Sequence, residues 1–327
     1  MIHVITGGAG FIGTNYIRYI LKKYPSDRII CADKLTYAGN RDNLKELEKD
    51  ERFIFEQVDI CDRKAVCNLF RTYRPDCVVN FAAESHVDRS IENPEIFLKT
   101  NVMGTGVLLD AVNEMGVTRF HQISTDEVYG DLAIEDTDVK FSEKSILAPS
   151  SPYSASKASA DLLCLCCFRT YNTPVTISRS SNNYGPYQFP EKLIPVVIEK
   201  ALRNEAVPVY GDGKNVRDWI HVNDHCSAID AIIRGGKAGE IYNVGGGNER
   251  SNTDVVKAVL KALGKPEELI QFVKDRPGHD RRYSLNCGKI KTELGWTPQT
   301  DFEQGLCETI EWYKSHKKWL EKILKRQ

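Results

Sequence analysis

A strand, a glycine turn and a helix open this chain, and together they restrict its fold more than any other stretch. His3 to Thr6 form a short apolar run, Gly7 to Gly13 supply the turn, and apolar residues then recur at helical spacing from Ile12 to Leu21. The turn contains G-x-G-x-x-G, whose glycines let a pyrophosphate approach the N-terminus of the helix. Because this spacing alone is weak, its meaning depends on the residues that follow.

The second apolar run, Arg28 to Ala32, ends at Asp33, which lies twenty residues beyond Gly13. A carboxylate at this interval accepts hydrogen bonds from an adenosine ribose and repels a 2′-phosphate. The alternative is that Asp33 only caps the end of the strand. Position and motif together favour the binding role, and they favour NAD over NADP as the cofactor.

Strands and helices alternate through the first half of the chain. This alternation predicts an α/β fold with a doubly wound parallel sheet of the Rossmann type and a smaller mixed α/β substrate-binding domain. We expect residues 1–180 to form the NAD-binding domain, with part of residues 216–245 returning to it, and residues 181–215 and 246–327 to bind substrate. Further strands are predicted at Phe53–Val58, Cys77–Phe81, Arg119–Ser124 and Val175–Arg179, and helices at Arg63–Tyr73, Pro94–Met115 and Pro152–Asn172.

Two stretches carry the candidate chemistry. The strand that reaches Ser124 places Thr125, Asp126 and Glu127 at its carboxyl end, where open α/β sheets hold their ligands. Tyr153 and Lys157 lie four residues apart, so they project from one face of the predicted helix. A cation beside a phenol favours the phenolate, and this pair can therefore act as a general base. A Tyr-x-x-x-Lys motif alone is common and is weak evidence. Here it follows an amino-terminal segment typical of nucleotide binding, and this position favours the catalytic interpretation.

The later segments point to a second, phosphate-bearing ligand. Ser180 to Pro190 is polar and aromatic, as expected of a loop that closes on a polar ligand. Arg217, Arg276, Arg281 and Arg282 supply guanidinium groups suited to phosphate, although a single arginine is more often a surface ion pair.

Composition excludes several classes of partner. With 44 basic and 45 acidic residues, the chain offers no electrostatic reason to bind nucleic acid or an anionic membrane. No stretch reaches the ~20 apolar residues that span a bilayer, and the start lacks a leader pattern. Ten cysteines without a paired framework fit a reducing compartment, so we expect a cytoplasmic protein. Cys164, Cys166 and Cys167 are interpreted as core residues because no zinc-like spacing accompanies them, and no metal is expected.

These residues resemble the extended short-chain dehydrogenase/reductase family, in its nucleotide-sugar branch. The resemblance covers nearly the whole chain, and several of its motifs are long and specific. Epimerases of this superfamily share the glycine turn and Tyr-x-x-x-Lys but usually lack the Asp126-Glu127 pair, so the resemblance is to the dehydratases. The matching stretches are Thr6–Gly13, Asp33–Asn40, Ala82–Ile91, Ser124–Gly130, Ser151–Asp161, Arg179–Pro195, Arg217–Trp219 and Arg276–Tyr283.

The resemblance implies residue roles at two ligands, NAD and a nucleotide sugar. For NAD, the implied residues are Gly7, Gly10, Phe11, Ile12 and Gly13 at the turn, Asp33, Lys34, Leu35 and Thr36 at the ribose, Asp59 and Ile60 near adenine, and Ala82, Ala83, Thr100, Tyr153, Lys157 and Asn183 near nicotinamide. For the sugar nucleotide, they are Ser85, Thr125, Asn182, Lys192, Leu193, Pro208, Val209, Tyr210, Arg217, Asn252, Asp275, Arg276, Pro277, Gly278 and His279.

The implied reaction is the loss of water from dTDP-glucose to give the 4-keto-6-deoxy sugar, with hydride taken from carbon 4 and returned to carbon 6. Tyr153, held as phenolate by Lys157, would deprotonate the 4-hydroxyl while Thr125 hydrogen-bonds that oxygen. Glu127 would then take the proton of carbon 5, and a protonated Asp126 would donate to the departing 6-hydroxyl. A nucleotide-sugar 4-epimerase and a nonenzymatic NAD-binding regulator are the alternatives. The resemblance also implies a homodimer.

Overall fold

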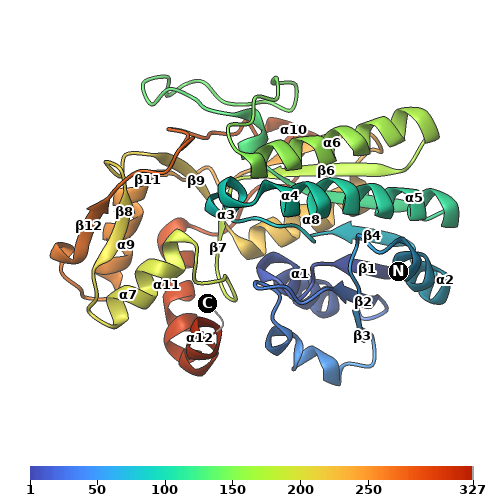
Figure 1. The fold of residues 1–327 in the computed structure, drawn as a ribbon, viewed down its shortest axis with the longest axis horizontal. Helices are drawn as coiled ribbons and strands as arrows, with labels where there is room; N and C mark the ends of the chain where they lie inside the picture. Colours follow the sequence, from blue (N-terminus) through green and yellow to red (C-terminus); the bar gives the residue numbers. More distant parts are fainter. Residues whose placement is uncertain (326–327) are drawn as a thin grey trace.

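A parallel sheet of seven strands lies at the centre of the fold (Figure 1). The computed structural model describes residues 1–325. The strand order is β10-β6-β5-β4-β1-β2-β3, and every neighbouring pair is parallel. This arrangement confirms the predicted Rossmann-type sheet. The strands are β1 Ile2–Thr6, β2 Arg28–Asp33, β3 Phe53–Gln57, β4 Cys77–Asn80, β5 Arg119–Thr125, β6 Val175–Ser180 and β10 Ile241–Val244.

Helices cover both faces of this sheet, which makes it doubly wound. On one face α2 (Arg63–Tyr73), α5 (Thr105–Met115) and α6 (Pro152–Tyr171) bury a shared apolar core against the strands. On the other face α1 (Phe11–Lys23) and α8 (Val222–Gly235) do the same. Strands buried on two faces usually have nearly continuous apolar runs, and β2 supplies one. Strands β5 and β6 instead bury polar side chains that bond one another, such as His121 and Ser178 at 3.1 Å.

The predicted helix from Pro94 to Met115 is wrong in its middle. The segment consists of α4 (Pro94–Phe97), a π-helical stretch at Leu98–Gly104, and α5. Within the wider turn the Asn101 side chain accepts from the Glu84 N–H at 2.9 Å and donates to the Ser156 hydroxyl at 2.8 Å. The π stretch thus joins the segment after β4 to α6, and such turns often occur at functional sites.

Within the described residues, two smaller sheets and four helices form a second part of the molecule, on the left in Figure 1. They enclose a core of their own, to which α7, α9 and α11 contribute. One sheet has the order β11-β9-β7, and the other pairs β12 with β8. The elements are β7 Asn182–Tyr184, α7 Leu193–Leu202, β8 Val207–Tyr210, β9 Val216–His221, β11 Glu249–Ser251, α9 Asn252–Ala262, β12 Ile270–Val273, α11 Phe302–Ser315 and α12 Lys317–Leu324. Helix α10 (Gly288–Leu294) packs instead against α8 and β10 of the main sheet.

The predicted loop from Ser180 to Pro190 is wrong at β7. Asn182 to Tyr184 pair in parallel with Trp219 to His221 of β9, far along the chain. A strand this short is defined by its distant partner and not by its own sequence, so local pattern does not reveal it. The rest of the segment is irregular, as expected.

The chain returns to the first part after β9. Helix α8 packs against α1, and β10 adds to the sheet beside β6. The strand order reverses between β1 and β4, and a ligand crevice is expected at such a point, outside the carboxyl ends of the strands.

The cysteines of α6 differ in exposure. Cys164 is buried and Cys167 is half-buried, but Cys166 is exposed, so the core interpretation is wrong for Cys166 because that face of the helix turns outward. All ten cysteines are free thiols. Across residues 1–325, no helix is long and apolar enough to cross a membrane.

Candidate active site

A cavity of about 750 Å³ lies at the carboxyl ends of the central strands and extends between the two parts of the molecule. Its walls include the glycine turn after β1, the end of β2, the segment after β4, and the end of β5. The second part contributes the segment around β7, the start of α7, β8 and Arg276. One pocket therefore collects residues from more than ten elements of the chain.

The glycine turn forms a cradle at one end of the cavity. Gly7 has a φ of +67°, and a Cβ placed on Gly13 would lie 2.5 Å from the Gly7 carbonyl oxygen, so side chains are excluded here. Helix α1 begins after Gly10 without any side-chain cap. Its first N–H groups are therefore available to an anion, and this cradle fits the pyrophosphate of NAD.

Asp33 closes the same end of the cavity. Its buried carboxylate accepts hydrogen bonds from the Ala9 N–H at 2.9 Å and from the Leu35 N–H at 2.7 Å. Burial raises its pKa, and these two bonds oppose that shift. Asp33 stabilises the turn and also lines the cavity, and its binding of an adenosine ribose stays a prediction. Beyond it, Lys34 forms an ion pair with Asp59 at 2.6 Å.

The end of β5 carries three candidate catalytic groups into the cavity. Thr125 is the last residue of the strand, and its hydroxyl accepts from the Glu127 N–H at 3.3 Å to start a short 3-10 turn, Asp126–Tyr129. The same hydroxyl donates to Asp126 Oδ1 at 3.2 Å. The other carboxylate oxygen of Asp126 is buried without a partner. A polar atom in this situation is costly unless a ligand satisfies it.

The two adjacent acids experience different environments. Burial raises the pKa of Asp126 well above its ordinary value, and the neighbouring Glu127 charge raises it further. Burial also raises the pKa of Glu127, but Arg276, Lys192 and Arg217 oppose that shift. Asp126 is therefore the better proton donor and Glu127 the better acceptor, which is the division that an elimination requires.

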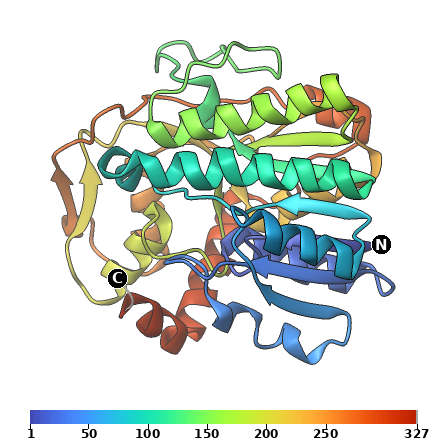
Figure 2. The same cartoon turned by 45° about the vertical axis from the view of Figure 1, so that its right-hand side comes forward.

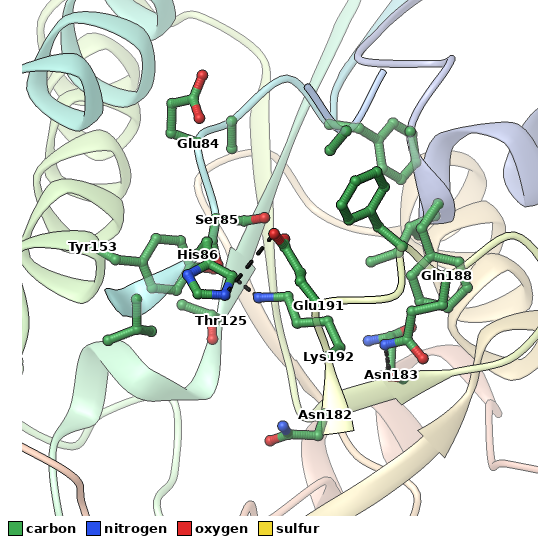
Figure 3. A pocket seen from close by; sticks show the side chains of 18 of the residues that line it. Glu84, Ser85, His86, Thr125, Tyr153, Asn182, Asn183, Gln188, Glu191 and Lys192 are labelled. Carbon is green, nitrogen blue, oxygen red and sulfur yellow. Dashed lines mark hydrogen bonds and ion pairs between the residues drawn. The ribbon is translucent and has the colours of Figure 1, made fainter. Parts of the chain in front are cut away.

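Tyr153 and Lys157 project from the start of α6. Ser151 and Ser154 form a capping box, and Pro152 occupies the first turn, so the beginning of this helix is firmly fixed. The Lys157 amine donates to the Ile123 carbonyl oxygen at 2.5 Å. Figure 3 shows the Tyr153 ring reaching from its helix toward Thr125 and His86.

Burial dominates the proton affinity of this pair. It raises the pKa of the Tyr153 phenol, and the nearby Glu127 carboxylate raises it further, while a hydrogen bond with Thr125 opposes the shift. Burial lowers the pKa of Lys157, and the Asp161 charge opposes this. A positive charge behind Tyr153 is therefore needed to make a base of the phenol near neutral pH.

Cationic side chains line the opposite wall. Lys192 donates to the Ser85 carbonyl oxygen at 2.8 Å, and Arg276 lies 3.5 Å from Asp88. Arg217 is buried and donates to backbone carbonyls, including that of Asp280 at 2.8 Å. These fixed positive charges suit a diphosphate.

Arg281 and Arg282 do not line the cavity, so the prediction that they face a phosphate is wrong. Arg281 pairs with Asp212 at 3.0 Å, and Arg282 pairs with Glu249 at 2.8 Å. Both guanidinium groups are occupied by carboxylates outside the pocket.

Most of the residues predicted for NAD or sugar nucleotide line this one cavity. Four lie just outside its wall. Leu35 packs against the apolar core and lines a small neighbouring pocket, because its positive φ of 60° turns it from the main cavity. Asp275 instead bonds the His279 ring at 2.6 Å, and Pro277 and Gly278 form the turn between them.

Several cavity residues were not predicted from the sequence. His86 lies 3.9 Å from Glu191, and Figure 3 shows this contact between them, beside Lys192. Two features of the sequence could have pointed to these residues. Glu191 immediately precedes Lys192, and His86 lies inside a stretch that carried the family resemblance. Single polar side chains of this kind are identified only when the fold brings them to a shared wall. Other lining residues that were not predicted include Glu84, Val87, Asp88, Gln188, Phe189, Trp219 and Tyr283.

Comparison with known proteins gives consistent matches over nearly the whole chain. The sequence profile of the family described as GDP-mannose 4,6 dehydratase matches residues 4–309. A dTDP-glucose 4,6-dehydratase of Escherichia coli (strain K12) is 48% identical, over 98% of this chain and 94% of that protein.

Solved structures give the same relation. DesIV, a dTDP-glucose 4,6-dehydratase from Streptomyces venezuelae with NAD and TYD bound, has a TM-score of 0.95 and is 46% identical, over 99% of this chain and 100% of that one. A UDP-glucose 4-epimerase from Thermotoga maritima is similar in fold, with a TM-score of 0.89, but is 30% identical, over 96% of this chain and 99% of that one.

Proposed function

This chain belongs to the GDP-mannose 4,6 dehydratase family, and on that premise we propose that it is an NAD-dependent lyase that removes water from dTDP-glucose. The product is the 4-keto-6-deoxy sugar nucleotide. The observation that carries this proposal is the Asp126-Glu127 pair in the cavity wall, where Asp126 is buried and Glu127 is half-buried, beside Thr125 and Tyr153.

Residues at the glycine-turn end of the cavity would hold the adenosine diphosphate half of NAD. The uncapped start of α1 suits the pyrophosphate, and Asp33 suits the adenosine ribose. When bound, NAD would accept hydride from carbon 4 of the sugar and return it to carbon 6. The chain's own side chains would supply every proton transfer.

Tyr153 is the base for the 4-hydroxyl, with Lys157 as the cation behind it. Thr125 lies beside the phenol and hydrogen-bonds the same substrate oxygen. A ketone at carbon 4 acidifies the hydrogen of carbon 5. Glu127 then takes that proton, and protonated Asp126 donates to the 6-hydroxyl, which leaves as water. As hydride adds to carbon 6, a proton returns to carbon 5 from Glu127, which completes the 4-keto-6-deoxy product. These roles are supported by the raised pKa of Asp126 and by the cations that face Glu127.

A nucleotide-sugar 4-epimerase is the second candidate, because a UDP-glucose 4-epimerase shares the fold. An epimerase needs the oxidation but no acid for a leaving hydroxyl. The unpartnered Asp126 oxygen in the cavity wall therefore favours the dehydratase.

The mass of the product separates the two candidates. The purified protein would be incubated with NAD and either dTDP-glucose or UDP-glucose. The masses of the nucleotide-sugar products would then be measured by mass spectrometry. Loss of one water from dTDP-glucose is the expected result. A product of unchanged mass would refute the dehydratase, and a faster reaction with UDP-glucose would refute the choice of nucleotide.

We further propose that the protein acts as a cytoplasmic homodimer. The α4–α5 segment and α6 run side by side on the surface in Figures 1 and 2. Together they expose apolar side chains, with Leu98 51%, Met103 67% and Leu162 57% exposed. A second copy that covers these faces would form a four-helix interface. The cytoplasmic location is supported by the ten free thiols.

The predicted division into a cofactor domain and a substrate domain remains a proposal. It is supported by the return of α8 and β10 to the main sheet. Residues 326 and 327 of the predicted substrate domain lie outside the described residues.

A further inference from the structure

A buried ion pair, Asp161 with Arg179, lies behind the candidate catalytic residues, and neither side chain lines the cavity. Asp161 accepts from Arg179 Nε at 2.9 Å and from the Ser124 hydroxyl at 3.0 Å. Both members of the ion pair are almost completely buried, Asp161 at 0% and Arg179 at 2% exposure. Asp161 and Arg179 play no part in the chemistry proposed above.

This cluster contacts each element that bears a catalytic group. Asp161 lies one helical turn beyond Lys157 on α6, so both side chains leave the same face of the helix. Ser124 immediately precedes Thr125 at the end of β5. The Arg179 guanidinium lies 4.8 Å from the ring centroid of Tyr129, in the turn that carries Asp126 and Glu127.

Lys157 needs a negative charge nearby. Its amine is buried, its hydrogen bond goes to the uncharged Ile123 carbonyl, and burial favours the neutral amine. Asp161 is the carboxylate that opposes this effect, and Cys164 is the other titratable group that acts on the amine. One oxygen of Asp161 is buried without a hydrogen-bond partner.

Burial raises the pKa of Asp161, and the groups that face it from other elements favour its charged form. Arg179 of β6 and Ser124 of β5 both oppose the effect of burial on its pKa. The face of the Tyr129 ring packs against the Arg179 guanidinium. A buried carboxylate with these partners is a fixed charge, and a fixed charge acts strongly on a neighbour in a medium of low polarity.

We propose that Asp161 is a positioning residue for the proposed reaction: it supplies the negative charge that holds Lys157 as an ammonium behind Tyr153. It acts through Lys157 and does not touch the substrate. Arg179 and Ser124 fix the carboxylate against the strand that bears Thr125, so charge and geometry are set by one cluster. The inference rests on the proposed role of Tyr153 as base.

The test uses the NAD-loaded enzyme with Asp161→Asn, which keeps the size of the side chain and removes its charge. Ser159→Ala is the matched control, because it removes a hydroxyl on the same helix that donates to the Ala155 carbonyl, and it leaves the cluster intact. Arg179 would lose its partner in Asp161→Asn, so Asp161→Asn with Arg179→Met removes the ion pair as a unit and is better tolerated. Circular dichroism and NAD binding verify folding of each variant.

Two measurements report on Tyr153. The first is the pH titration of phenolate absorbance, taken as the difference between each protein and the same protein with Tyr153→Phe. The second is the pH profile of single-turnover NADH formation with dTDP-glucose. With less charge on Lys157, the phenolate forms at higher pH, so both curves should move up by about one pH unit in the two Asp161 variants. Ser159→Ala should leave both in place.

Each outcome is decisive. If the wild-type enzyme does not turn over dTDP-glucose, the proposed function fails. If it does, and a folded Asp161 variant keeps the wild-type titration and profile, the inference fails. A uniform loss of rate without a shift in pH, or failure of both Asp161 variants to fold, would assign the cluster to stability alone and overturn the proposal.

Discussion

Replacing Asp126 by Asn should block the elimination while leaving the oxidation intact. The carboxyl accepts from Thr125 through one oxygen, at 3.2 Å, and its other oxygen is buried without a partner. Asparagine reproduces this shape, since its amide oxygen can keep the Thr125 bond and its NH₂ group can occupy the free position. It cannot transfer a proton, however. Because general acid catalysis contributes ~10²-fold or more, turnover should fall by at least that factor, equivalent to about 2.7 kcal/mol in the barrier.

Stopped-flow absorbance of NADH provides the assay. In the variant, NADH should accumulate after dTDP-glucose is added, because the oxidised sugar waits for its hydroxyl to leave. Asp138→Asn, an exposed carboxylate in the loop after Gly130, is the matched control and should behave as wild type. Wild-type turnover in Asp126→Asn would refute the acid role, and loss of the NADH signal would show that the residue acts in the first step.

Four further predictions follow from the same geometry. Glu127→Gln should suppress solvent deuterium at carbon 5 of the product, and normal incorporation measured by mass spectrometry would exclude Glu127 as the base. Asp126→Asn should also stabilise the fold. The carboxyl of Asp126 has a pKa of about 4 in the unfolded chain and a raised pKa in the folded protein, so wild-type stability falls as the pH rises from the first value through the second. Asparagine does not titrate, and a difference in Tm between the two proteins that fails to grow with pH would contradict the burial argument. Gly13→Ala places a Cβ 2.5 Å from the Gly7 carbonyl oxygen and should weaken NAD binding roughly tenfold or more by calorimetry, and unchanged affinity would argue against the cradle. Met103→Glu should yield monomers by sedimentation, whereas Phe272→Glu, at a 56% exposed side chain on β12, should not. A dimeric Met103→Glu protein would count against the interface.

Local sequence patterns were sufficient to predict the strands of the central sheet and most of the helices that cover it. Helix α2 has the predicted bounds, Arg63–Tyr73, because Asp62 caps its first turn and Arg74 ends it in the left-handed conformation. Strands β2 and β5 end where the first polar ligand candidates were expected, at Asp33 and Thr125. Apolar runs, caps and turns are local signals, and they act over a few residues.

The sequence was insufficient where distant segments define the structure. The short strand β7 exists because β9 pairs with it, and the π-helical stretch before α5 is accompanied by the Asn101 contacts to Glu84 and Ser156. The same holds for the site: its catalytic residues fall in motifs, whereas His86 and Glu191 reach the cavity from two different parts of the fold. The unpartnered oxygen of Asp126 depends on packing, which spacing along the chain does not specify.

The fate of the hydrogen on carbon 4 tests the central claim most directly. The enzyme would be given dTDP-glucose that carries deuterium at carbon 4, and the product examined by NMR. The account predicts a product that has lost water and carries the label at carbon 6. A label that stays at carbon 4, with water retained, would contradict it.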